Sequence, residues 1–146
     1  MPEPHSTKTI QRMRELRPEL VDSLTAVVEA AHQQSDAELV ELWRTQIADT
    51  LRIPRQVKTD IPAEKREAVS DLYRSPLFSP IERAQLAFTE QFVISVDSVT
   101  DSQVRELVQL GSESDTYKFI VSLYAIEMTD RLTHVLGTIL DTKEDD

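Results

Sequence analysis

Residues 35–54, SDAELVELWRTQIADTLRIP, carry the clearest helix signal of the chain and hold its only tryptophan. Ser35 can cap such a helix while Glu38, three residues later, returns a second hydrogen bond, so the pair predicts a capping box. Pro54 predicts the end, because proline lacks a backbone N–H and disfavours helical backbone at the residue before it. One face is marked at spacings of three and four by Leu39, Leu42, Trp43, Gln46, Ile47 and Thr50. The segment therefore predicts an amphipathic helix.

The region before this helix predicts one further helix and an arm. Pro18 suits a first helical turn, and the apolar stripe that follows extends to Ala31. This helix is expected to pack against residues 35–54, because short connections make antiparallel neighbours. Residues 1–17 have no sustained apolar period and several basic side chains. They predict a flexible arm, or an arm that docks on an acidic neighbouring subunit.

Two more helices are predicted from the residues that would cap their N-termini. Ser79 with Glu82, and Thr100 with Gln103, have the spacing of capping boxes. Gly111 is the expected left-handed residue that ends the second of these helices.

The last helix is predicted to begin at Ser112 or Ser114, to reach about residue 140 and to leave residues 141–146 as an acidic tail. Its apolar residues cover much of its circumference: Phe119, Val121, Leu123, Tyr124, Ala125, Ile126, Met128, Leu132, Val135, Leu136 and Ile139. Such a helix needs more than one neighbour. It is therefore either central in the monomer or part of a subunit interface.

The overall composition favours a single all-α domain over residues 18–140, with five or six helices. The chain has 146 residues, which fits one domain, and only 2 glycines, which argues against tight hairpins. We expect the helix of residues 35–54 and the terminal helix to form the central pair.

Several function classes are excluded by composition. The net charge of −10 argues against nucleic acid as a partner, because binding to phosphates requires clustered lysine and arginine. No cysteine is present, which excludes thiol peroxidase chemistry and thiolate metal sites. Three scattered histidines predict no metal site, and no cofactor motif is recognisable. Neither a signal peptide nor a membrane span is indicated, so a cytoplasmic protein without a membrane partner is expected.

Three stretches resemble the AhpD-like proteins of the carboxymuconolactone decarboxylase superfamily. The first is the pattern of Glu38, Leu39, Leu42, Thr45, Gln46 and Ile47; the second is FSPIERAQLAFTEQF at residues 78–92; the third is DRLTHVLGT at residues 130–138. The resemblance implies an AhpD-like helical fold and a homo-oligomer.

The redox motif of the peroxidase members is missing from the chain. The two cysteine positions of the family fall on Thr50 and Ile53, and its histidine position falls on Val57. Only Glu38 matches the carboxylate of the family's proton relay. The resemblance therefore implies a relative that does not reduce hydroperoxides, whatever a family label of alkylhydroperoxidase would suggest.

Two groups of residues are candidates for chemistry. Glu127, Asp130, Arg131 and His134 share one helical face, where they form either a site that moves a proton and holds an anion or a solvated stripe of ion pairs. Glu38 is either a helix cap or a carboxylate in a remodelled pocket, where burial would raise its pKa.

These candidates lead to two hypotheses of function. In the first, the protein is a cofactorless lyase or decarboxylase that acts on a small carboxylic acid, with Glu38 and His134 as catalytic acid and base. Arg44 and Arg131 would bind the acidic metabolite, beside a pocket at Thr50. In the second, it is a non-catalytic oligomeric binding or scaffold protein, which predicts excess apolar helix surface and no enclosed polar pocket.

Overall fold

The computed structural model describes the backbone of residues 5–53, 62–72 and 74–144, with side chains for 8–53, 62–72 and 74–139. The elements are α1 (His5–Leu16), α2 (Pro18–Gln33), α3 (Ala37–Leu51), α4 (Ala63–Ala68), η1 (Val69–Asp71), α5 (Pro80–Ile94), η2 (Val96–Ser98), α6 (Asp101–Leu110) and α7 (Glu113–Glu144). Of the described residues 85% are helical and none is in a strand. The predicted all-α class is confirmed, but these ranges contain seven α-helices and not five or six.

The additional helix is α1, where the sequence predicts a flexible arm. It packs against α2 and α7, and Thr9 is buried in this contact. Gly137 of α7 permits the approach, because a Cβ there would lie 3.1 Å from the Thr9 hydroxyl oxygen. The sequence does not reveal this helix because its buried contact is made by a polar residue and a glycine rather than by an apolar stripe. Residues 1–4 lie outside the described ranges.

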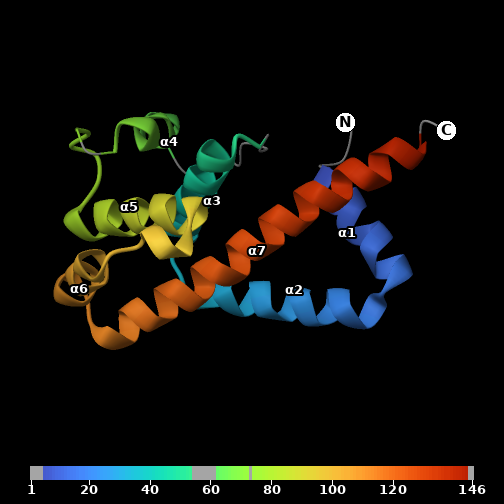
Figure 1. The fold of residues 1–146 in the computed structure, drawn as a ribbon, viewed down its shortest axis with the longest axis horizontal. Helices are drawn as coiled ribbons and strands as arrows, with labels where there is room; N and C mark the ends of the chain where they lie inside the picture. Colours follow the sequence, from blue (N-terminus) through green and yellow to red (C-terminus); the bar gives the residue numbers. More distant parts are fainter. Residues whose placement is uncertain (1–4, 54–61, 73, 145–146) are drawn as a thin grey trace.

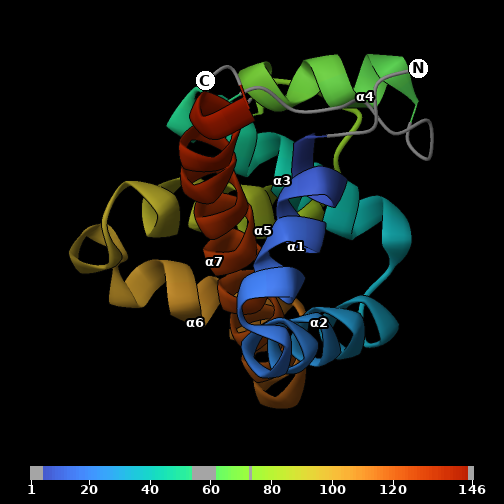
Figure 2. The same cartoon turned by 90° about the vertical axis from the view of Figure 1, so that its right-hand side faces the viewer.

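The long helix α7 crosses the whole molecule and joins two groups of helices (Figures 1 and 2). Helix α1 packs along its C-terminal part, α2 approaches its N-terminal half with the end that leads to α3, and α3, α5 and α6 gather around its N-terminal part. The predicted central pair is wrong, because α3 packs mainly on α5 and makes a smaller contact with α7. The predicted pairing of α2 with α3 is also wrong: the apolar side of α2, with Val21 and Ala31 buried, belongs to the contacts with α1 and α7.

The core lies where α3, α5 and α7 meet. Trp43 contacts Phe119 with ring centroids 4.9 Å apart, and Phe88 contacts Phe119 at 5.6 Å, so one aromatic side chain from each helix meets at this point. The indole N–H of Trp43 donates to Gln85 Oε1 at 3.2 Å, which satisfies its only polar group. The apolar face predicted for residues 35–54 is therefore the side of α3 that faces this core.

The N-terminus of α3 differs from the predicted capping box. Asp36, not Ser35, is the N-cap, and its carboxylate accepts from the backbone N–H of Glu38 at 2.8 Å. The predicted box is wrong because a cap one residue later leaves Glu38 in the second helical position, where its side chain is free to pair elsewhere. At the other end Arg52 adopts a left-handed conformation with φ 57°, so α3 ends before Pro54, which is outside the described residues.

The other predicted caps are mostly confirmed. Both capping boxes are present, at Ser79 with Glu82 and at Thr100 with Gln103. Of the two candidates at α7, the Ser112 hydroxyl is the one that accepts, from the N–H of Asp115 at 3.0 Å. Gly111 differs from the prediction, because its φ of −124° is not left-handed.

Within the described ranges, no helix combines the length and the apolar character needed to cross a bilayer.

Candidate functional site

Glu38 lies in a three-residue charge cluster with Lys65 and Glu82. Lys65 Nζ donates to Glu38 at 2.7 Å and lies 2.7 Å from a carboxylate oxygen of Glu82, so the lysine joins α4 to α3 and α5. Burial would raise the pKa of Glu82, but hydrogen bonds from Lys65 and Ser79 outweigh it and hold that pKa below its ordinary value. Burial would lower the pKa of Lys65, but its bonds to both carboxylates raise it. The cluster is an ion-pair network that fastens three helices.

Arg44, a predicted anion-binding residue, is already bound to a carboxylate. Its Nη2 and Nε donate to the two oxygens of Asp130 at 2.9 and 3.3 Å, a bidentate contact between α3 and α7. Glu41 lies 3.9 Å from Nη1. Burial would lower the pKa of Arg44, but Asp130 and Glu41 raise it. A substrate carboxylate would have to displace Asp130.

Arg131 is also bound to groups of the chain, whereas His134 is exposed. Arg131 Nε pairs with Glu127 one turn earlier on α7, and Nη2 donates to the Val93 carbonyl at 2.7 Å. His134 is exposed on α7. The four residues Glu127, Asp130, Arg131 and His134 thus share a helix without forming one site: Asp130 binds Arg44 of α3, Glu127 and Arg131 bind each other, and His134 is exposed.

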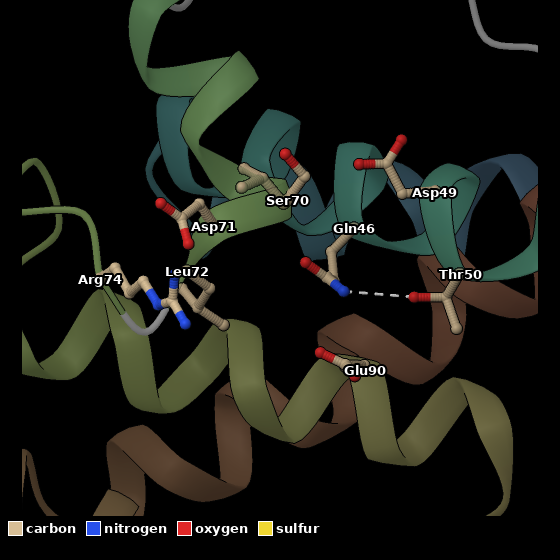
Figure 3. A pocket seen from close by; sticks show the side chains of 9 residues that line it. Gln46, Asp49, Thr50, Ser70, Asp71, Leu72, Arg74 and Glu90 are labelled. Atoms are coloured by element: carbon tan, nitrogen blue, oxygen red, sulfur yellow. Dashed lines mark hydrogen bonds between the residues drawn. The ribbon is translucent and has the colours of Figure 1, made fainter.

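Of the predicted site residues, Thr50 lines the pocket that the structure describes at the C-terminal end of α3. Glu38 lies twelve residues before it, so the two are about 18 Å apart along α3 by helical rise. The pocket has a volume of about 620 Å³, and its lining residues come from α3, α5 and the segment around η1: Gln46, Asp49, Thr50, Val69, Ser70, Asp71, Leu72, Arg74 and Glu90 (Figure 3). Val57, the family's histidine position, lies outside the described residues.

The ionisable groups that line this pocket carry more negative than positive charge. Asp49, Asp71 and Glu90 contribute three carboxylates against the single guanidinium of Arg74. None of the four side chains makes an ion pair or a hydrogen bond with another residue in the described part of the chain. Burial raises the pKa of Asp49 above its ordinary value. The pocket is therefore an acidic one, which is unsuited to a small carboxylic acid.

The amide of Gln46 points from α3 toward α5, with Glu90 facing it and Asp71 to one side, while the Asp49 carboxylate points away from it (Figure 3). Its Nε2 donates to Thr50 Oγ1 at 3.2 Å, while its Oε1 is buried without a hydrogen-bond partner. The sequence predicts Gln46 on the apolar face of α3, and a polar residue at such a position indicates a polar environment there. The contributions of Asp71, Arg74 and Glu90 were missed, since their separation in the sequence gives no sign that they meet.

A second feature is the outer face of α7. It carries seven apolar side chains whose exposed fractions range from 36% at Met128 to 72% at Tyr117: Tyr117, Val121, Tyr124, Met128, Leu132, Val135 and Ile139. We call these seven residues the outer stripe. The opposite face of the helix is buried, as at Phe119, Leu123 and Ile126. An exposed apolar surface of this length is typical of a protein interface.

Comparisons with known protein families, with curated proteins and with solved structures find no match to this chain. The resemblance to AhpD-like proteins therefore stays a prediction. Nor do the described residues bring three potential ligands of the His, Cys, Asp or Glu type together in a way that would hold a metal ion.

Proposed function

We propose that the protein is a self-associating helical binding or scaffold protein, in which two copies pair through the outer stripe of α7. The observation that carries this proposal is the exposure of seven apolar side chains in one continuous row. Removal of that row from water is favourable, and soluble monomers rarely expose a contiguous apolar surface of this kind.

A second copy of the chain fits the stripe because its spacing is symmetric. The steps between successive residues are 4, 3, 4, 4, 3 and 4, which read the same in both directions from Met128. In an antiparallel pair centred there, Met128 meets its own copy, Val121 meets Val135 and Tyr124 meets Leu132. Tyr117 then meets Ile139. Every apolar residue opposes another one, as an isologous two-fold contact requires.

The size and charge of the stripe also favour this pairing. If each of its seven side chains loses roughly 100 Å² to the partner, two copies bury roughly 1,400 Å², within the range of stable interfaces. No charged residue interrupts the stripe, although the chain has a net charge of −10. The resemblance to AhpD-like proteins, which implies a homo-oligomer, agrees with this proposal.

A cofactorless lyase or decarboxylase has less support from the geometry. Arg44 and Arg131 are bound to carboxylates of the chain, Glu38 is bound to Lys65, and the pocket at Thr50 is acidic. A thiol peroxidase function has no support, because the chain has no thiol that could attack a peroxide.

The pairing predicts that a charge on the stripe separates the copies. Val135→Glu places a carboxylate on the stripe, where it would be buried without a partner, so we expect the sedimentation-equilibrium mass to fall from a dimer to a monomer. The matched control is Leu20→Glu on α2, which adds the same charge at an apolar residue that is also more than half exposed (67% against 54% for Val135) and should stay dimeric. Circular dichroism verifies that both variants remain helical. A monomeric parent protein, or a dimer unaffected by Val135→Glu, would contradict the proposal.

A further inference from the structure

The pocket at the C-terminal end of α3 contains an unsatisfied acceptor. Gln46 is only 6% exposed, and its Oε1 has no hydrogen-bond partner although its Nε2 is bound to Thr50. A buried acceptor of this kind costs free energy, so a bound group that donates to it would be stabilised. Figure 3 shows the amide between the α3 and α5 walls, with Asp49 and Thr50 on α3 and Glu90 on α5.

The remaining walls define what such a group would be. Asp49, Asp71 and Glu90 are acceptors only when ionised, and with Arg74 they leave a formal charge of −2 in the pocket. Val69 and Leu72 are buried and give the pocket an apolar component. An occupant therefore has to donate hydrogen bonds, carry positive charge and offer some apolar surface.

We propose that this pocket binds a small organic cation with N–H donors, namely an alkyl ammonium or guanidinium compound. One N–H group donates to Gln46 Oε1, the charge is balanced by the surrounding carboxylates, and methylene groups contact Val69 and Leu72. The volume of about 620 Å³ lies within the range of small-molecule sites. An inorganic cation fits less well, because no three potential metal ligands converge within the described residues. The inference is independent of the pairing through α7.

Calorimetric titration tests the chemical class with three matched probes. 1,4-Diaminobutane has charge and N–H donors, tetramethylammonium has charge alone, and 1,4-butanediol has neither charge nor N–H. We expect saturable binding of the diamine at one site per chain, with at least about tenfold weaker binding of the other two. Agmatine, which adds a guanidinium group, should bind as the diamine does. Equal binding of tetramethylammonium, or no binding of the diamine and agmatine, would overturn the proposal.

Two variants test the location. Glu90→Gln should weaken diamine binding about tenfold, while Glu106→Gln, which removes an equal charge from the exposed surface of α6, should leave the affinity unchanged. Gln46→Met should also weaken binding, yet raise the melting temperature, because it removes an acceptor that is unsatisfied in the free protein. Equal effects of Glu90→Gln and Glu106→Gln would show general attraction to an acidic protein and would overturn the site.

Discussion

At the scale of single residues, the bidentate contact between Arg44 and Asp130 is a polar link between α3 and α7. Both side chains are largely buried, with exposed fractions of 23% and 16%. Removal of one charge would leave the other in a poorly hydrated environment without its partner. The pair therefore matters for stability, and it removes both groups from the list of free binding residues.

Asp130→Asn is expected to lower the free energy of unfolding by about 2 kcal/mol, because the amide retains one acceptor but loses the charge. Urea denaturation measures the change. Asp22→Asn is the matched control, since it breaks the exposed pair with Arg14 at 3.6 Å and should cost no more than about 0.5 kcal/mol. An equal loss of unfolding free energy in the two variants would show that the buried pair of Arg44 with Asp130 stabilises the fold no more than the exposed pair does.

The sequence predicts some of these residues well and others not at all. Ser79, Glu82, Thr100 and Gln103 act over three residues, so their spacing alone was sufficient to predict their capping bonds. Partners from distant elements have no such local signal, as Arg44 demonstrates by finding Asp130 eighty-six residues later. The anion-binding role predicted for the arginine came from its charge, without knowledge of this partner.

At the scale of elements, Lys65 is the residue that fastens the short helix α4. A helix of six residues is not stable on its own, and this one has no fully buried residue. Ala68 at its end packs against the core, and Lys65 adds ionic contacts with Glu38 of α3 and Glu82 of α5.

Lys65→Gln is expected to lower the free energy of unfolding by about 1 kcal/mol near neutral pH and to accelerate amide hydrogen exchange in α4. Because the folded pKa of Glu82 lies below its ordinary value of 4.5, the stabilisation from this pairing is present above that value and is lost as the pH falls through the folded pKa. The difference between parent and variant should therefore shrink as the pH falls below 4.5.

Exposed Lys8 on α1 provides the control, because Lys8→Gln should change neither the stability nor the exchange in α4. A difference between Lys65→Gln and the parent that stays constant across this pH range would exclude Glu82 as the source of the stabilisation.

Helix packing was less predictable than helix position. The apolar stripes and caps located most of the observed helices, but α1 buries Thr9 against Gly137 and has no apolar stripe to reveal it. The choice of partner helix depends on which apolar faces fit together best. The wide apolar circumference of α7 attracts α1 and α2, so α2 does not pair with its neighbour in sequence, α3.

At the scale of the whole molecule, α7 is buried on one face and apolar on the other. The sequence left two positions open for this helix, central in the monomer or at a subunit interface. Within one chain it already packs against α1, α2, α3 and α6, and the outer stripe remains exposed, although Tyr124 also contacts Phe92 of α5. We infer that it holds both positions, with the inner face in the monomer core and the stripe between two copies.

The pairing through α7 is tested most directly by disulfide trapping, since the chain has no cysteine of its own. In an antiparallel pair centred on Met128, thiols introduced by Met128→Cys meet at the two-fold axis and should oxidise to a covalent dimer. Thiols introduced by Val121→Cys would lie about 21 Å apart along the helices, too far for a disulfide, but should crosslink when mixed with the Val135→Cys variant. Non-reducing electrophoresis should show covalent dimers for Met128→Cys and for the mixture of Val121→Cys with Val135→Cys. It should show monomers for Val121→Cys by itself. Self-crosslinking of Val121→Cys as efficient as that of Met128→Cys, or monomers throughout, would contradict the account.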